Sequence, residues 1–264
     1  MATPPPRTKQ TGLAPAPARG LEPGEDAVRE LMAPLDWGEA PQIGVLGDTG
    51  AGKTTLMRAL VEEYLRRSAG WAIVVDDKET RAKYAGQERR DLSDLRSNPV
   101  DQKGRRVVIF RGDPRTGVDA DPEEAAELAW KRAAHGWPSL VVHDELVAGR
   151  RDLIVSCQWR TGIEYVPKSF TKGRAVGIAD LWGAQSPSEV PVDPFEQSNA
   201  IVCFKLGGLG LAKLRERNYV RGELEDVIRG LHAMEVPPPQ RGDFVVLRRG
   251  QEWNGKISKL RGIT

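Results

Sequence analysis

The amino-acid sequence predicts an α/β protein with a doubly wound, mostly parallel β-sheet. Six short apolar runs are separated by polar segments, and most of them lack the alternation of apolar and polar residues of a half-exposed strand. Strands that are buried on both faces have this composition. Helix-like segments lie between several of the runs, which favours strands joined by crossover helices.

The expected strands are rich in Val and Ile, and they cover residues 43–46, 72–75, 107–110, 140–142, 175–181 and 201–204. Residues 54–67 follow the first run and are expected to form a helix. A second helix is expected over 122–134, because Pro122 suits a first helical turn. At the end of the chain, residues 244–248, a turn at Gly250 and residues 252–257 predict a C-terminal hairpin.

The chain of 264 residues divides by composition into a tail and a folded domain. Residues 1–39 are rich in Pro and Ala and are expected to be disordered, although residues 25–32 could form a short helix. Residues 40–264 are expected to form the folded domain, which is long enough to bury a sizeable core. The tail carries a net charge of −2 and the domain one of +4.

Cysteine content and hydropathy exclude several classes of protein. Only two cysteines occur, Cys157 and Cys203, which excludes a disulfide framework and a cysteine-based zinc site and fits a reducing compartment. No stretch approaches the length of about 18 apolar residues that a membrane span needs. The N-terminus lacks the apolar core of a signal peptide. We therefore expect a cytoplasmic protein without a membrane span of its own.

Residues 47–54, GDTGAGKT, match the phosphate-loop pattern G-x-x-x-x-G-K-[ST] at every fixed position. They lie between an expected buried strand and an expected helix, where backbone N–H groups and the helix N-terminus meet phosphate oxygens. Lys53 would reach the β- and γ-phosphates, and the Thr54 hydroxyl would bind Mg²⁺. A glycine-rich turn that binds nothing is the alternative. The predicted ATP-binding residues are Gly47, Asp48, Thr49, Gly50, Ala51, Gly52, Lys53, Thr54 and Thr55.

Asp144 and Glu145 follow the apolar run at 140–142. An apolar strand that ends in Asp-Glu resembles a Walker B motif. Asp144 would hold Mg²⁺ directly or through water, and Glu145 would be the catalytic base that orients and deprotonates the attacking water. A solvated strand end is the alternative. A small-molecule kinase must exclude water from the γ-phosphate, whereas a base beside a water favours hydrolysis.

Three further segments together resemble the FtsK–HerA superfamily of DNA-pumping P-loop ATPases. Residues 72–78, AIVVDDK, end in the Asp and Lys that commonly follow the second strand of that family. Residues 173–178, GRAVGI, are similar to its Gly-Arg-Lys-x-Gly-x stretch, with Ala175 in place of Lys. Residues 182–188, WGAQSPS, are similar to its Ala-Thr-Gln-Arg-Pro-Ser, with Ala184 for Thr and Ser186 for Arg. The resemblance covers roughly residues 41–220 and implies a P-loop NTPase fold of the RecA-like, ASCE type.

The resemblance implies catalytic roles for two more residues. Gln185, at the end of the strand beside the Walker B strand, would bind the γ-phosphate or the attacking water; a polar cap on a buried strand is the alternative. Arg174, at the opposite end of the same strand, would complete the site of a neighbouring subunit as a trans arginine finger. An exposed surface arginine is the alternative. A trans arginine implies a homo-oligomeric ring, of five or six subunits.

A basic segment lies between the Walker B motif and the strand that ends at Gln185. Residues 146–174 carry a net charge of +4 and contain Trp159 and Tyr165, which is typical of a loop that contacts DNA. Residues 205–264 are also basic. A solvated charged surface is the alternative for either segment. Phosphate contacts would make binding of double-stranded DNA non-specific. The basic residues of the first segment are Arg150, Arg151, Arg160, Lys168, Lys172 and Arg174.

The leading hypothesis is a ring-forming ATP-hydrolysing translocase that packages viral double-stranded DNA into a capsid, with ATP and Mg²⁺ as cofactors. The chain lacks the transmembrane helices of chromosome translocases and conjugation coupling proteins and the added β-barrel of repair translocases, so it most resembles compact viral packaging ATPases. Two alternatives are a plasmid or chromosome DNA-transfer ATPase and a nucleotide-gated scaffold. A third is a P-loop small-molecule phosphotransferase, with Arg150 and Arg151 in a lid. A capsid-vertex or membrane-protein partner is expected, in the host cytoplasm or on the virion.

Overall fold

The structure is a computed structural model that describes residues 28, 31, 40–76, 84–89, 92, 106–111, 121–146, 154–155, 158–159, 162–231, 242–248, 251 and 255–260. Its strands are β1 (Gln42–Leu46), β2 (Trp71–Val75), β3 (Gln87–Arg89), β4 (Val107–Phe110), β5 (Ser139–His143), β6 (Ile154–Val155), β7 (Gln158–Trp159), β8 (Ile178–Ala184), β9 (Ala200–Cys203), β10 (Gly242–Arg248) and β11 (Ser258–Leu260). The helices are α2 (Lys53–Arg67), α3 (Pro122–Ala133), α4 (Tyr165–Lys172), α5 (Val192–Gln197), α6 (Gly208–Glu216) and α7 (Glu223–Gly230), with 3₁₀ helices η2 (Gly173–Val176) and η3 (Pro187–Glu189).

Nine of the strands in the described residues form one sheet, in the order β11-β10-β9-β1-β8-β5-β2-β4-β3. The seven strands from β9 to β3 are parallel, and β10 and β11 add an antiparallel edge. β8 lies between β1 and β5. The carboxyl ends of these three strands therefore meet at the same edge of the sheet.

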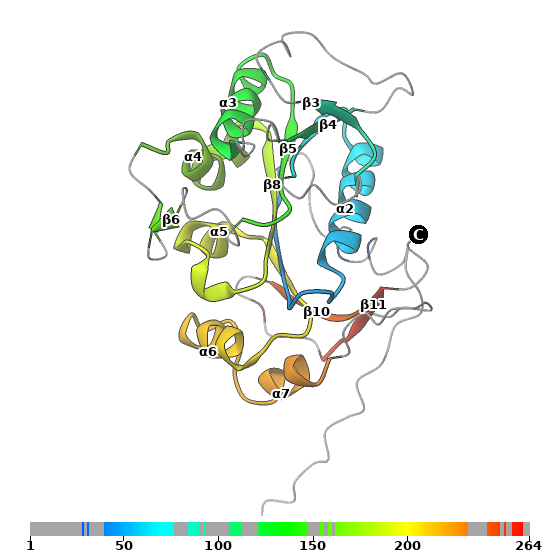
Figure 1. Ribbon diagram of the computed structural model, residues 1–264, viewed down its shortest axis with the longest axis vertical. Coiled ribbons are helices and arrows are strands. Elements are labelled where there is room, and N and C mark those ends of the chain that lie inside the picture. The colour runs from blue at the N-terminus through cyan, green and yellow to red at the C-terminus, as the bar shows by residue number, and fades with distance from the viewer. Residues whose placement is uncertain are drawn as a thin grey trace, which may run out of the picture.

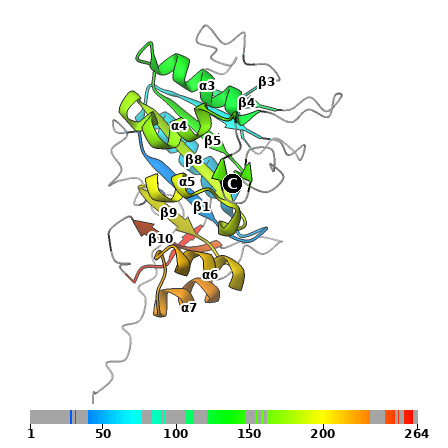
Figure 2. The ribbon, with the colours of Figure 1, turned by 90° about the vertical axis from the view of Figure 1, so that its left-hand side faces the viewer.

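Helices cover both faces of the sheet, which confirms the doubly wound fold. Figure 1 shows α2 on one side of the strands and α3, α4 and α5 on the other, and Figure 2 shows this second layer from the front. On the α2 side, Leu56, Met57 and Leu60 are buried against strand residues such as Val45 and Val202. Burial of each such side chain stabilises the fold by about 1.5–3 kcal/mol. Because helices cover both faces of the sheet, the strands are apolar on both faces.

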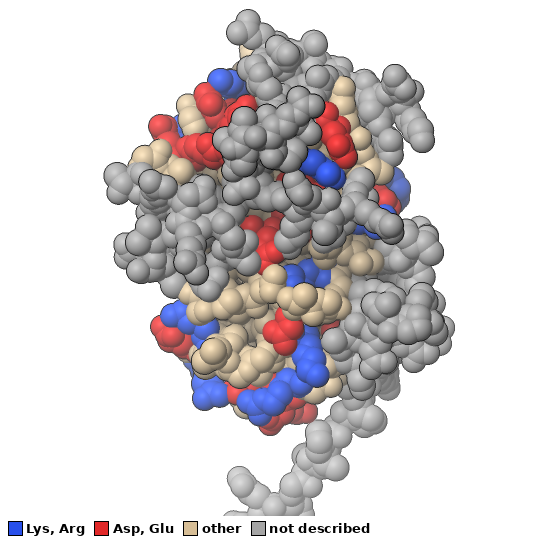
Figure 3. All heavy atoms as spheres, viewed as in Figure 1, with Lys and Arg blue, Asp and Glu red and all other residues tan. Residues whose placement is uncertain are grey.

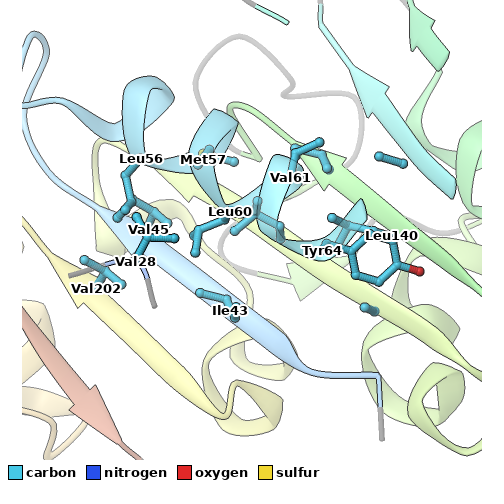
Figure 4. Close-up of a cluster of buried hydrophobic side chains, with 14 of the residues drawn as sticks. Val28, Ile43, Val45, Leu56, Met57, Leu60, Val61, Tyr64, Leu140 and Val202 are labelled. Carbon is cyan, nitrogen blue, oxygen red and sulfur yellow. The ribbon is translucent and has the colours of Figure 1, made fainter. Parts of the chain in front are cut away.

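Two residues of the predicted tail, Val28 and Leu31, are helical and buried in the core that α2 covers. Figure 4 shows Val28 beside Val45 and Val202. Arg248 of β10 donates a 3.3 Å hydrogen bond from Nη2 to the backbone oxygen of Leu31. The other residues of 1–39 lie outside the described part of the chain. Among the described residues, no helix has the length and apolar character that a membrane crossing requires.

Two expected boundaries were wrong. The strand expected over 175–181 begins at Ile178, because residues 173–176 form η2 and Gly177, with φ of +85°, turns the chain before the strand. The C-terminal hairpin is confirmed, since β10 pairs antiparallel with β11. Its second strand is residues 258–260 rather than 252–257, and Gly255, with φ of +76°, precedes it. The expected turn at Gly250 lies outside the described residues.

Two glycines let β8 approach its neighbours closely. Gly44 of β1 faces the indole of Trp182, where a Cβ would lie only 2.3 Å from Trp182 Cζ2. A Cβ on Gly183 would lie 2.6 Å from the backbone oxygen of Asp144. Contacts this short are essentially forbidden, so both positions require glycine. The result is close packing of the strand ends that carry the candidate site.

Candidate active site

The loop between β1 and α2 has the backbone that a phosphate site requires. Gly50 and Gly52 have φ of +77° and +108°, in the left-handed region that favours glycine. Helix α2 begins at Lys53 and has no acidic residue in its first turn. A Cβ on Gly47 would lie 2.7 Å from Phe204 Cβ, so the loop must also be small where it leaves the strand. The positive end of α2 therefore points into a loop that would suit an anion.

Lys53 directs its ammonium group into this loop. Its side chain is buried, and Nζ donates to the backbone oxygens of Gly47 at 2.7 Å and Asp48 at 3.1 Å. A buried ammonium beside a helix N-terminus creates a positive potential that suits a polyphosphate. All nine predicted ATP-binding residues lie on this loop or in the first turn of α2, with Thr54 and Thr55 directly after Lys53.

Asp144 follows the end of β5 and faces Thr54. Thr54 Oγ1 donates to Asp144 Oδ2 at 3.4 Å, and the buried hydroxyl of Tyr84 donates to Oδ1 at 2.9 Å. Burial, together with the charge of Asp144, raises the pKa of Tyr84 well above its ordinary value, so Tyr84 is a neutral donor.

The oxygens of Thr54 and Asp144 fit magnesium. Mg²⁺ prefers hard oxygen ligands and commonly takes one or two from the protein, the rest coming from water and substrate phosphates. The structure shows no group of three or more His, Cys, Asp or Glu side chains arranged to hold a metal within the residues it describes. A magnesium ion at Thr54 and Asp144 would therefore depend on a bound nucleotide for its remaining ligands.

Gln185 joins the two halves of the site. It directly follows β8, the strand between β1 and β5. Its Oε1 accepts a 2.7 Å hydrogen bond from Thr49 Oγ1 on the phosphate loop, and its Nε2 donates to Oε1 of Glu145. One amide thus connects the loop that would surround the γ-phosphate with the carboxylate that would accept a proton.

Arg174 lies at the opposite edge of the sheet, on η2, before β8 begins. β8 has seven residues; at about 3.3 Å per residue a strand of this length spans roughly 23 Å. That distance exceeds the reach of an arginine side chain. The guanidinium of Arg174 therefore cannot reach the phosphate loop of its own chain.

Two exposed apolar side chains flank the η2 segment. Trp137 is 43% exposed and Val176 is 40% exposed. Their segments adjoin, because Ser139 N donates to the backbone oxygen of Gly177 at 3.1 Å. The guanidinium of Arg132 lies 5.4 Å from the Trp137 ring centroid, within the range of a cation–π contact. The Arg174 edge thus presents two apolar side chains beside the half-buried Arg174.

A buried polar network ties α4 to the sheet at this edge. Asp180 of β8 is completely buried, and its Oδ1 accepts a 2.7 Å hydrogen bond from Ser169 Oγ. Gln42 Nε2 donates to the backbone oxygen of Phe170 at 2.7 Å and lies 3.4 Å from Asp180 Oδ2. Burial raises the pKa of Asp180 to about 7, against the lowering effect of these hydrogen bonds.

Glu123 of α3 holds the other end of α4. Its carboxylate accepts hydrogen bonds from the backbone N–H groups of Glu164 at 2.6 Å, Tyr165 at 2.5 Å and Val166 at 2.9 Å. The first N–H groups of a helix have no partner within it, so Glu123 acts as an N-terminal cap supplied from another helix. Helix α4, and the η2 segment after it, are therefore anchored at both ends.

The predicted DNA-contact segment is only partly described. Lys168 Nζ lies 4.5 Å from the centroid of the Trp130 ring and 3.8 Å from Glu164 Oε1, so this cation already has partners on the protein. Lys172 is exposed. Trp159 lies in β7 and its side chain is not described; Arg150, Arg151 and Arg160 lie outside the described residues.

In the second basic segment, the cations of α6 and α7 are paired with carboxylates. Over α6 and α7, Lys and Arg lie interspersed with Asp and Glu (Figure 3). Arg215 and Arg229 both pair with Glu225, and Lys213 pairs with Glu216 at 2.8 Å. These helices therefore offer a mixed charged surface rather than a basic one.

No sequence motif predicts the contact of Tyr84 with Asp144 or that of Glu123 with the start of α4. Tyr84 stands in a polar segment without periodicity, and nothing in the sequence connects it with Asp144. Glu123 has a weak signal, because an acidic residue near a helix N-terminus is common for other reasons. Of the expected strand-end motif, Asp76 is buried and lies 3.5 Å from Arg111 Nη2, while Asp77 and Lys78 are outside the described residues.

Solved structures with this fold include a genome packaging NTPase and a plasmid coupling protein. The genome packaging NTPase B204 from Sulfolobus turreted icosahedral virus 2, in complex with ATP-γS, matches with a TM-score of 0.59 and 15% identity over 85% of this chain and 99% of that chain. The plasmid coupling protein TrwB, in complex with ADP and Mg²⁺, matches with a TM-score of 0.53 and 13% identity over 88% of this chain and 87% of that chain.

No protein-family model matches the sequence, and no curated protein matches it significantly. At identities this low, the structural likeness establishes the fold. The fold is the P-loop NTPase fold that the sequence motifs predicted.

Proposed function

We propose that this chain, which has a P-loop ATPase fold, is an ATP-hydrolysing translocase that packages viral double-stranded DNA. The observation that carries the proposal is the position of Gln185, which bonds both Thr49 of the phosphate loop and Glu145. A binding protein needs only the loop. An amide that contacts both the γ-phosphate side and a general base is useful to an enzyme that hydrolyses ATP and responds to the nucleotide it holds.

In the proposed reaction, the phosphates of ATP bind the loop N–H groups, and Lys53 moves from the loop carbonyls to the β- and γ-phosphates. Magnesium, held through Thr54 and Asp144, would neutralise phosphate charge. Glu145 takes a proton from water as the water oxygen bonds to the γ-phosphorus and the bond from that phosphorus to ADP breaks. Gln185 holds the attacking water and changes partners when the γ-phosphate leaves.

The ring is supported by the separation of Arg174 from its own phosphate loop. An arginine at the amino edge of β8 can act on a nucleotide only in another subunit, where it would stabilise charge on the transferring phosphoryl group. The exposed Trp137 and Val176 beside it fit a surface that packs against a neighbour. A head-to-tail contact of this kind closes into a ring when the rotation between subunits returns to the first subunit. We propose five or six subunits.

The DNA contact is assigned to the basic segment 146–174, which begins directly after Glu145 and leads through α4 to Arg174. Helices α6 and α7 within 205–264 are a weaker candidate because their cations are paired with carboxylates. Contacts to phosphates alone would make the binding non-specific. In this proposal, the ATPase domain spans 40–264, and the tail 1–39 or the β10–β11 hairpin docks a capsid-vertex or membrane protein in the host cytoplasm.

A second candidate is DNA transfer between cells or along a chromosome. It is favoured by the likeness to the coupling protein TrwB and to the conjugation coupling protein TcpA, which matches with a TM-score of 0.52 and 15% identity over 86% of this chain and 61% of that chain. Both candidates predict the same ATPase chemistry. They differ in the docking partner rather than in the site.

The test is steady-state ATP hydrolysis measured at increasing protein concentration, with and without long double-stranded DNA. A ring motor predicts activity that rises faster than linearly with protein and rises again with DNA. A rate of ATP hydrolysis that rises linearly with protein concentration and does not change with DNA would indicate a small-molecule phosphotransferase. Tight ATP binding without turnover would indicate a nucleotide-gated scaffold.

A further inference from the structure

Tyr84 is a partner of Asp144 that no sequence motif identifies. Its hydroxyl donates to Asp144 Oδ1 at 2.9 Å, while Oδ2 faces Thr54 Oγ1 at 3.4 Å. The two carboxylate oxygens therefore have different partners. We propose that Tyr84 is a positioning residue that fixes the orientation of Asp144 toward magnesium nucleotide, an inference that rests on the proposed ATPase function.

The carboxylate of an aspartate can rotate about the bond that joins it to the rest of the side chain. The terminal torsion of Asp is broad and roughly two-fold, so packing alone does not decide where each oxygen points. A hydrogen bond to one oxygen decides it. Tyr84 is only 3% exposed, and its ring packs in the same core as α2. Its hydroxyl is therefore a donor with a fixed position, and it leaves Oδ2 directed at the first turn of α2.

A second carboxylate, that of Asp76, also acts on Tyr84. Asp76, at the end of β2, lies close enough to act electrostatically on Tyr84 and has Arg111 as its own partner, 3.5 Å away. β2 and β5 pair in parallel, so Asp76 and Asp144 follow neighbouring strand ends. Tyr84 hydrogen-bonds the carboxylate of Asp144, which faces the phosphate loop.

The expected effect of losing this hydrogen bond is a weaker response to magnesium. Partners that orient a metal ligand typically change metal affinity about 10–100-fold when they are removed. Tyr84→Phe removes one oxygen atom and retains the buried ring. Binding of nucleotide in the absence of metal depends on the loop and Lys53, which Tyr84 does not touch in the described structure, so it should not change.

The experiment measures binding of a fluorescent ATP analogue to the full chain, first in EDTA and then over a range of Mg²⁺ concentrations. Tyr84→Phe should raise by about 10–100-fold the Mg²⁺ concentration at which half of the Mg²⁺-dependent change in analogue binding is reached. It should leave binding of the analogue in EDTA unchanged. Tyr64→Phe is the matched control. It also removes a buried phenol oxygen, but that oxygen lies near Ser68 and Gly70, at the opposite end of α2 from the site.

A double-mutant cycle tests whether Tyr84 acts through Asp144. In an Asp144→Ala background, Tyr84→Phe should add no further shift, because the group that it orients is absent. Tyr84→Leu is a second variant without the hydroxyl, and it should show the same Mg²⁺ shift as Tyr84→Phe.

Three results would overturn the role of Tyr84 and leave the proposed ATPase function standing. They are an unchanged Mg²⁺ requirement in Tyr84→Phe, an equal shift in Tyr64→Phe, and an additive shift in the Asp144→Ala background. Each presumes a wild-type chain that binds the analogue in a Mg²⁺-dependent way. A wild-type chain that binds no nucleotide would instead overturn the proposed ATPase function, and the role of Tyr84 with it.

Discussion

The two edges of the sheet satisfy their polar groups in different ways. At the carboxyl edge, Gln185 and Glu145 are half-buried and are hydrogen-bonded to each other. Gln185 also accepts a hydrogen bond from the exposed Thr49. At the amino edge, Asp180 and Gln42 are completely buried and bond the backbone and side chains of α4. Polar groups in contact with water can exchange one hydrogen-bond partner for another. A buried polar group that loses its partner destabilises the fold, because water cannot replace that partner. The carboxyl edge is therefore suited to change during a reaction and the amino edge to hold Arg174 in place.

The largest effect is expected from Glu145→Gln at the carboxyl edge. The rate of ATP hydrolysis should fall about 10³-fold, within the range that general-base catalysis contributes, because the amide cannot accept the proton of water. ATP affinity, measured by titration of the analogue, should be retained. Glu62→Gln, on the exposed side of α2, is the matched control and should hydrolyse normally. A small change in Glu145→Gln would favour a phosphotransferase.

Arg174→Ala tests whether the amino edge serves a neighbour. The rate should fall about 10³-fold, as for other arginine fingers, although the residue cannot reach its own phosphates. Mixing Arg174→Ala with Glu145→Gln subunits should restore activity, because some interfaces then combine an intact Glu145 with an intact Arg174. Mixing Arg174→Ala with the double variant should not restore it. Absence of recovery in the first mixture would mean that Arg174 has no trans role.

Asp180→Asn tests whether a protonated carboxyl holds the amino edge. The folded pKa of about 7 lies above the ordinary aspartate pKa of 3.8, so the folded state binds this proton more tightly. This contribution to the free energy of unfolding is complete below pH 4 and is lost as pH rises toward 7. Wild type should lose about 2–3 kcal/mol more than Asp180→Asn between pH 5 and pH 8. Urea denaturation at both pH values measures it, and parallel pH profiles would contradict it.

The smallest effect is expected from Glu123→Gln, which weakens the cap on α4. Loss of the charged acceptor for three N–H groups should lower the free energy of unfolding by about 1–2 kcal/mol. Glu127→Gln removes an exposed carboxylate that pairs with Lys131 on the same helix, and it should cost less than about 0.5 kcal/mol. Amide hydrogen exchange should be faster in α4 only in Glu123→Gln. Equal exchange in both variants would show that Glu123 does not anchor α4.

The central strands could be predicted from the sequence because they are buried on both faces. β1, β2, β4 and β5 each fall within one residue of an apolar run at both ends. β3 was missed because it is three polar or charged residues at the edge of the described sheet, where one neighbour suffices. Ala175 and Val176 are as apolar as a strand, but the turn at Gly177 separates them from β8. A local turn thus overrides the apolar pattern.

The candidate site divides in the same way. The phosphate loop was predictable because its spacing reflects one backbone conformation, which Gly50 and Gly52 adopt. The bond from Gln185 to Thr49 joins residues 136 positions apart and depends on β8 lying beside β1. Tyr84 reaches Asp144 across 60 positions. Pairings between distant segments follow from the tertiary fold, and a single sequence does not encode them in any local pattern.

The order of residues along β8 gives the proposed ring a sense of rotation. The strand begins after Arg174 and ends before Gln185. Each subunit would hold its own nucleotide at one end of this strand and reach the next nucleotide from the other end. Such sites would be connected in series, and the series would have a direction, because Arg174 of each subunit would always reach the nucleotide of the same neighbour. The succession of hydrolysis events around the circle would then have a handedness fixed by the polarity of one buried strand.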